Sequence, residues 1–287
     1  FIASCYAEIV IRFIQDWLRH HPQAKQNTFY ILELGVGTGQ FSYYTMKKIF
    51  ELRDALQMSD IKIQYIMSDF TESNLNFWKT HAALQPYQEQ KCLDYAVYDL
   101  ENDESITLHN SGLTLTAGTT KNPIIVFANY IFDSVVNDTF SVKDSELKEA
   151  LVSLKTPKNN LMNNNPIEWE KVNIKYQENE IDSQYYADKH LNDILFDYRN
   201  SLKDTNFLFP IGPLRCIQNL NRISNNKLLL ISSDKGYSTL PELEDLDYPQ
   251  LDFHGSFSVM VNYHAIGNYF KRHQGDCFYQ TPRDGLS

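Results

Sequence analysis

The stretch that decides the fold is FYILELGVGTGQF, from Phe29 to Phe41. Its first six residues are aromatic or aliphatic apart from one glutamate, which is typical of a buried strand. The next five residues hold Gly35, Gly37 and Gly39, three of only 11 glycines in a chain of 287 residues. Because glycine adopts backbone conformations that other residues avoid, this concentration indicates a tight turn between a strand and a helix.

A glycine turn in this position lets a ligand touch bare backbone. The helix that follows adds unpaired N–H groups and the positive end of its dipole. Dinucleotide folds use the pattern G-x-G-x-x-G, but Gln40 stands where that pattern needs its third glycine. Glu33 is unexpected beside a pyrophosphate and suits a ligand that carries an ammonium group. The turn therefore favours S-adenosylmethionine over NAD as the cofactor.

Strand and helix patterns alternate along the chain. Strands are expected at 29–34, 62–67, 93–98, 123–128 and 227–232. Helices are expected at 7–18, about 40–56 and 71–84, with a short one near 131–136. Five apolar strands, most of them separated by helices, predict an α/β fold with a mostly parallel, Rossmann-like sheet and helices on both faces.

The fourth and fifth strands are about 98 residues apart, far more than an ordinary crossover needs. Strand patterns at 140–142 and 147–154 predict a hairpin that turns at 143–145. An Asn-rich run over 155–166 indicates an exposed loop, and a helix is expected over 182–203. After the fifth strand, we expect strands at 257–261 and 277–280 on either side of a helix at 264–272.

These patterns predict three parts of the chain. They are an N-terminal helix over 1–27, a Rossmann-like ligand-binding domain over 28–139 and 223–287, and an inserted cap or substrate region over 140–222. Since the sequence does not begin with Met, we expect it to be trimmed or to belong to a longer protein.

Polar side chains follow successive strands at one edge of the predicted sheet. Asp69 ends the second strand, Asp99 and Leu100 follow the third, and Asn129 ends the fourth. Ligands of open α/β sheets bind outside the carboxyl ends of the strands. The Asp69 carboxylate can accept both ribose hydroxyls of an adenosine, and Asp99 with Leu100 stands where the adenine edge would be recognised. Each acid alone could equally cap a helix or a turn.

The motifs ELGVGTG, SDF, YDL and FANYIFDSVV resemble class I S-adenosylmethionine-dependent methyltransferases, and most closely the MidA-like family. Members of that family include a mitochondrial protein-arginine methyltransferase. The long insertion, Asp234–Gly236 and the later FSVMVNYHAIGNYF add to the resemblance, which covers most of 28–275. The family's fourth-strand motif is Asn-Glu-x-x-Asp-Ala, so Tyr130 stands here in place of its glutamate.

The resemblance implies a methyltransferase with S-adenosylmethionine as cofactor and a set of residues that bind it. That set comprises Glu33, Gly35, Gly37, Gly39, Asp69, Asp99, Leu100 and Asn129. Asn129, Tyr130 and Asp133 are the predicted catalytic residues, because they stand where the methyl group and its acceptor should meet. A nitrogen or oxygen nucleophile must lose a proton, so Asp133 is a candidate base, with capping of the next helix as an equal alternative.

The composition of the chain argues against several classes of binding partner. A net charge of −10 and the lack of any long basic run argue against nucleic acid and anionic membranes. No apolar stretch approaches the ~20 residues of a spanning helix. Four scattered cysteines and eight histidines without a ligand motif predict free thiols and no metal site. We expect a cytoplasmic location, or the mitochondrial matrix if the source is eukaryotic.

The sequence is compatible with three functions. The first is methyl transfer to a protein side chain, arginine among them, or to a small molecule. The second is a non-catalytic scaffold or assembly factor that binds S-adenosylmethionine. The third is an NAD-dependent oxidoreductase, which Gln40 and Glu33 disfavour.

Overall fold

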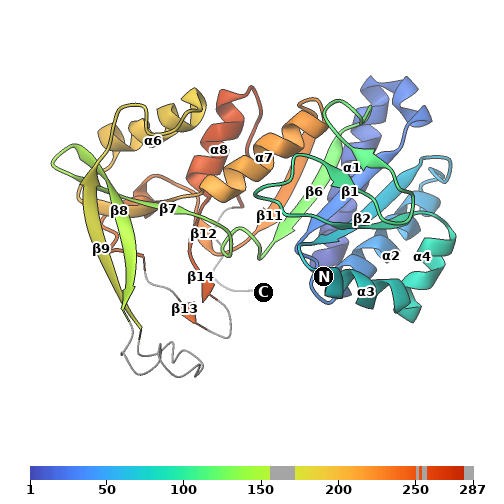
Figure 1. The fold of residues 1–287 in the computed structure, drawn as a ribbon. Helices are drawn as coiled ribbons and strands as arrows, with labels where there is room; N and C mark the ends of the chain where they lie inside the picture. The colour runs from blue at the N-terminus through green and yellow to red at the C-terminus, as the bar shows by residue number, and fades with distance from the viewer. Residues whose placement is uncertain (156–171, 250–251, 254–256, 281–287) are drawn as a thin grey trace, which may run out of the picture. The chain divides into compact units, whose positions relative to one another are not determined.

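The computed structural model describes residues 1–155, 172–249, 252–253 and 257–280 (Figure 1). Their contacts form two compact units. The first comprises Phe1–Ile131 and Arg215–Ser233, and the second comprises Phe132–Leu214 and Asp234–Ser287. The predicted division into an N-terminal helix, a ligand-binding domain and a cap or substrate region stays a prediction; its ranges are 1–27, 28–139 with 223–287, and 140–222.

The first unit contains a five-stranded parallel sheet with the strand order β11–β6–β1–β2–β3 (Figure 1). Its strands are β1 (Phe29–Leu34), β2 (Ile63–Asp69), β3 (Leu93–Val97), β6 (Ile124–Asn129) and β11 (Leu228–Ser233). Each lies within two residues of its predicted bounds, which confirms the α/β fold with a central parallel sheet. The strand order reverses at β1, which pairs with β2 on one side and β6 on the other.

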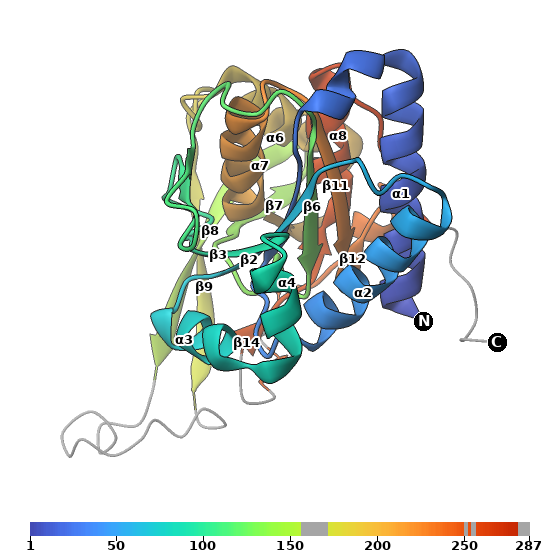
Figure 2. The same ribbon diagram turned by 90° about the vertical axis from the view of Figure 1, so that its right-hand side faces the viewer.

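Helices cover both faces of this sheet (Figure 2). The helical segments of the unit are α1 (Ile2–His20), η1 (Pro22–Gln26), α2 (Gln40–Ala55), α3 (Glu72–Thr80), η2 (Ala82–Leu84), α4 (Gln85–Glu89) and the later part of α7 (Ile211–Ile223). A small antiparallel pair, β4 (Ile106–Thr107) with β5 (Thr114–Leu115), completes it. The helices predicted at 7–18, 40–56 and 71–84 are confirmed, the last of them as α3 followed by η2.

The core of the first unit joins α1 to one face of the sheet. Val10, Ile11 and Ile14 are almost completely buried on α1, at the spacing of one helical face. They share a cluster with Ile31 and Phe127, which belong to β1 and β6. Each such side chain removed from water contributes about 1.5–3 kcal/mol before entropy is counted, so this cluster fixes α1 against the sheet.

The second unit is built on an antiparallel sheet with the order β10–β7–β8–β9. Its elements are β7 (Asp138–Lys143), β8 (Glu146–Lys155), β9 (Asn173–Glu180), α6 (Lys189–Ser201), β10 (Thr205–Phe209), β12 (Gly236–Tyr237), η4 (Pro241–Leu243), β13 (Asp252–Phe253), β14 (Phe257–Ser258), β15 (Val261–Asn262) and α8 (Tyr263–Arg272). The hairpin predicted around 143–145 is confirmed as β7 and β8. Most of the predicted loop at 155–166 lies outside the described residues.

The short helix predicted near 131–136 is wrong, because this segment forms turns and bends. The N–H of Asp133 donates to a carboxylate oxygen of Asp234 at 3.1 Å, and its carbonyl accepts from Val259. These long-range partners take the backbone groups that a helix would have used.

The strand predicted at 277–280 is also wrong, since no strand forms there. This segment is held by a side chain: the hydroxyl of Tyr279 donates to the carbonyl of Tyr263 at 2.7 Å. The helix predicted over 182–203 begins only at Lys189, where Asp188 accepts hydrogen bonds from two backbone N–H groups. The segment predicted as one strand at 257–261 contains β14 and the start of β15.

Among the described residues, no helix combines the length and apolar character needed to cross a lipid bilayer.

Candidate functional site

The glycine turn lies at the carboxyl end of β1, where the strand order of the sheet reverses. Gly35, Gly37 and Gly39 all have left-handed φ angles of 62°, 58° and 82°, which only glycine adopts readily. A Cβ atom added to Gly35 would lie 2.6 Å from Cδ1 of Ile131. A Cβ added to Gly37 would meet no atom of the described residues within 4 Å. The turn is therefore packed at Gly35 and open at Gly37.

Asp69, at the end of β2, lies against this open glycine. Its Oδ2 accepts from the backbone N of Gly37 at 3.4 Å, and the side chain is only 7% exposed. Thr71 and Asn74 donate further hydrogen bonds to the carboxylate, the latter at 2.9 Å. The structure thus brings together two residues that the sequence placed at the ends of neighbouring strands.

The indole of Trp78 holds the other side of the turn. Its Nε1 donates to the carbonyl oxygen of Gly37 at 2.8 Å, and its side chain is fully buried. Sequence reasoning assigned Trp78 only to a helix, and it missed Thr71 and Asn74 as partners of Asp69. The only sequence signal for these three residues as site residues was that they follow the end of β2.

Glu33 lies in the core, one residue before the end of β1. One of its carboxylate oxygens accepts hydrogen bonds from Ser42 at 2.6 Å and Tyr65 at 2.5 Å. Burial raises the pKa of Glu33 to about 7, although both hydroxyls act in the opposite direction. The side chain is only 5% exposed, so a contact with a cofactor ammonium group stays a prediction.

Asp99 follows β3 and is exposed, whereas Leu100 is buried. The Asp99 carboxylate accepts from the backbone N of Glu101 at 3.0 Å and from the side chain of Asn102 at 2.8 Å. The Asn102 hydrogen bond is the main reason that the pKa of Asp99 lies below its usual value. Asp99 therefore stabilises its own turn, and its part in adenine recognition stays a prediction.

Asn129 and Tyr130, at the end of β6, form a cluster with a residue from α1. The hydroxyl of Tyr6 donates to Oδ1 of Asn129 at 2.7 Å. Tyr130 has a left-handed φ of 51°, an exposed fraction of 69%, and a backbone N that donates to the carbonyl of Ser233 at 3.0 Å. A non-glycine residue in this conformation costs about 1–3 kcal/mol and is enriched at functional sites.

Tyr6 was not foreseen as a site residue, because it precedes the helix predicted at 7–18 and belongs to no motif. Burial raises the pKa of its hydroxyl to about 12, so the phenol is neutral and acts as a hydrogen-bond donor to Asn129. With Oδ1 of Asn129 engaged in this way, its amide nitrogen is the group left for another partner. No described residue bonds to that nitrogen.

Asp133 belongs to the second unit. Its carboxylate accepts from the hydroxyl of Ser134 at 2.7 Å, and its backbone N–H donates to Asp234. Burial, followed by the charge of Asp133, raises the pKa of Asp234 to about 6. A cavity of about 220 Å³ is lined by Asp133 together with apolar side chains that include Val152 and Leu208. The arrangement offers two neighbouring carboxyl groups, of which Asp234 loses its proton only near pH 6.

The described residues contain no cluster of three His, Cys, Asp or Glu side chains that could hold a metal ion. The four cysteines are free thiols in the structure: Cys5, Cys92, Cys216 and Cys277.

No family model matches the chain, and no curated protein matches it. Its fold is similar to the folds of two proteins from Burkholderia thailandensis with known crystal structures. Each of the two compares with this chain at a TM-score of 0.54 and a sequence identity of 11%. One is described as an uncharacterized COG1565 superfamily protein. The other is described as a COG1565 superfamily member and "likely methyl transferase" bound to S-adenosyl-homocysteine.

Both comparisons cover 93% of this chain, but only 62% and 60% of the two solved structures. The chain thus spans about three fifths of the length of the structures that it matches. At 11% identity the likeness shows the class of fold, an α/β fold of the kind found in that S-adenosyl-homocysteine complex.

Proposed function

We propose that the chain is an S-adenosylmethionine-dependent methyltransferase, with its cofactor at the glycine turn of the first unit. One observation carries this proposal: Gly37 faces open space while its N–H bonds to Asp69. A bare, left-handed glycine beside a buried carboxylate, at the point where the strand order reverses, is the arrangement that nucleoside cofactors use in open α/β sheets.

The residues around the glycine turn fit S-adenosylmethionine. Gly37 leaves room for the methionine part, and the Asp69 carboxylate can accept ribose hydroxyls once it exchanges a weak, 3.4 Å bond. Asp99 with Leu100 would border the adenine. Glu33 would face the ammonium group directly or through water. The solved complex with S-adenosyl-homocysteine supports this choice of cofactor over NAD.

The bound cofactor would supply an activated methyl group on a sulfonium. The protein's task is then to align a nitrogen or oxygen nucleophile with that methyl carbon and to accept a proton. Tyr6 fixes Asn129, and the strained backbone of Tyr130 presents an exposed aromatic ring beside it. These features support Asn129 and Tyr130 as residues that position the acceptor, while Asp133 remains the proposed base. The acceptor is proposed to be a protein side chain, arginine among them, or a small molecule.

Radiolabelled methyl transfer tests this function. Purified protein is incubated with methyl-labelled S-adenosylmethionine and a cell extract, and label is counted separately in macromolecules and in small molecules. Label above a no-enzyme control supports the proposal, and the fraction that carries it names the acceptor class. Binding of cofactor without labelling of any extract would favour the non-catalytic scaffold.

The variant Asp69→Ala should reduce both labelling and cofactor affinity, the latter by about a hundredfold, because hydrogen bonds to a charged group contribute about 1.5–3 kcal/mol each. Asp54→Ala, which changes an exposed carboxylate on α2, is the matched control. Unchanged affinity in Asp69→Ala, with the fold verified by circular dichroism, would show that β2 does not bind the ribose.

A further inference from the structure

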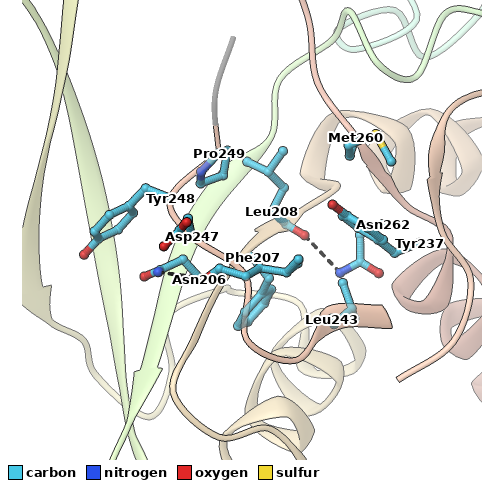
Figure 3. A pocket seen from close by; sticks show the side chains of 11 residues that line it. Asn206, Phe207, Leu208, Tyr237, Leu243, Asp247, Tyr248, Pro249, Met260 and Asn262 are labelled. Atoms are coloured by element: carbon cyan, nitrogen blue, oxygen red, sulfur yellow. Dashed lines mark hydrogen bonds between the residues drawn. The ribbon is translucent and has the colours of Figure 1, made fainter. Parts of the chain in front are cut away.

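The second unit contains a cavity of about 300 Å³ that none of the predicted site residues lines (Figure 3). Its walls come from β10, from the chain between Leu243 and Pro249, and from the segment around Met260 and Asn262. This volume is at the lower end of the range for small-molecule sites. It is therefore large enough for a small organic molecule.

Hydrogen bonds fix the walls of this cavity in place. Thr205 donates to the carbonyl of Leu243 at 2.6 Å and accepts from the backbone N of Leu246 at 3.0 Å. The amide of Asn206 donates to the carbonyl of Leu246 at 3.0 Å. On the opposite wall, the amide of Asn262 donates to the carbonyl of Leu208 at 2.9 Å (Figure 3). A site with walls fixed in this way loses little entropy when a ligand enters.

Most of the lining is apolar, and its charge is of one sign. Leu208, Leu246 and Met260 contribute apolar surface, whereas Asp247 is the one charged residue among the described residues that line the cavity. No Lys, Arg or His that the structure describes lines it. Asp247 also forms no hydrogen bond or ion pair with any residue that the structure describes. A carboxylate beside apolar walls attracts a cation and repels an anion.

A second polar group lies at the other end of the cavity. Figure 3 shows Asp247 on one side of Leu208 and Tyr237 on the other. The hydroxyl of Tyr237 has no hydrogen-bond partner among the described residues. A phenol can donate and accept, so this end tolerates a polar substituent, while the carboxylate end selects for positive charge.

We propose that this cavity binds a small primary amine with an apolar body. The ammonium group lies against Asp247, and the aliphatic or aromatic body packs against Leu208, Leu246 and Met260. The site belongs to the second unit, whereas the glycine turn belongs to the first. The inference therefore goes beyond the proposed methyl transfer and does not depend on it.

Three probes with the same body test the charge preference: 2-phenylethylamine, 2-phenylethanol and phenylacetate. Each is titrated into the whole chain at pH 7 and followed by calorimetry. The amine should bind about fivefold more tightly than the alcohol, since an exposed ion pair contributes up to about 1 kcal/mol. Phenylacetate should bind more weakly than both. Equal binding of the three probes, or no binding of the amine, would overturn the proposal.

Two variants test the location. Asp247→Asn should lower the affinity for the amine to that of the alcohol and leave the alcohol unchanged. Asp245→Asn is the matched control, because it changes a neighbouring exposed acid that does not line the cavity. Met260→Trp should fill the cavity and weaken both probes. An amine affinity that is unchanged in Asp247→Asn would contradict the assignment, whatever the filled variant does.

Discussion

Gly37 is the residue on which the cofactor proposal depends most. It combines a left-handed backbone with open space where a side chain would stand. The neighbouring Gly35 is different, since an added Cβ there would clash with Ile131. Substitution at Gly37 therefore probes the ligand site with the least disturbance of the protein's own packing.

Gly37→Ala should cost about 1–2 kcal/mol of folding stability, the usual penalty for a Cβ in the left-handed region. Its methyl group should also occupy the ligand space and lower the affinity for S-adenosylhomocysteine at least about tenfold, the equivalent of one lost contact. Gly112→Ala is the matched control, because Gly112 also has a left-handed φ, 69°, and open space around it. If both variants bind equally well in calorimetry, the turn is not the cofactor site.

Glu33 makes the stability of the protein depend on pH. Its pKa rises from the ordinary 4.5 to about 7 on burial. Between these values the native state keeps a proton that the unfolded state has lost, so the free energy of unfolding falls as the pH rises. Glu33→Gln keeps an acceptor for Ser42 and Tyr65 and removes the titration.

From pH 4.5 to pH 8, the wild type should therefore lose about 3 kcal/mol of stability relative to Glu33→Gln. Urea unfolding at both pH values measures this difference, and the contribution of Asp234 cancels because both proteins contain it. Parallel stability curves for the two proteins would contradict the pKa assigned to Glu33.

Among the elements, the β7–β8 hairpin has a turn geometry that its own turn residues do not favour. Its two-residue turn, Asp144-Ser145, has φ angles of 49° and 64°. Positive φ at both positions defines the turn type that favours Asn-Gly. Serine is a poor residue for the second position, so the turn is strained in the native sequence.

The double variant Asp144→Asn, Ser145→Gly should raise the free energy of unfolding by about 0.5–1 kcal/mol, because it relieves the strain of the left-handed backbone. Chemical denaturation measures the gain. Ser145→Val, a β-branched residue at the same φ, should destabilise instead. A double variant no more stable than the wild type would mean that this turn carries no strain.

Element prediction succeeded where the signal was local. The five strands of the parallel sheet are short runs rich in apolar residues, and the glycine turn follows directly from its composition. It failed at 131–136 and 277–280, because Asp234 and Tyr263 supply partners that are distant in sequence. It also did not foresee β9, β10 or α7.

The site was predictable to a similar extent. Gly37 and Asp69 were identified from their positions after strands, and the structure brings them into contact. Tyr6, by contrast, is 123 residues from its partner Asn129. Nothing in the helical pattern distinguishes a tyrosine that packs from one whose hydroxyl reaches a strand end, so this part of the site needed the fold.

For the whole molecule, the sheet order explains why the predicted cofactor residues of the first unit belong together. Because β1 lies between β2 and β6, the carboxyl ends of these three strands carry Gly35, Asp69 and Asn129 side by side. The crevice at such a switch point is where ligands of open α/β sheets bind. The net charge of −10, by comparison, adds little to the choice of partner.

We propose that the first unit binds S-adenosylmethionine rather than a dinucleotide. The most direct test is a calorimetric titration of the whole chain with S-adenosylhomocysteine and, separately, with NAD. We expect saturable, one-to-one binding of S-adenosylhomocysteine and no heat of binding from NAD. Binding of NAD, or no binding of S-adenosylhomocysteine by a folded protein, would contradict it.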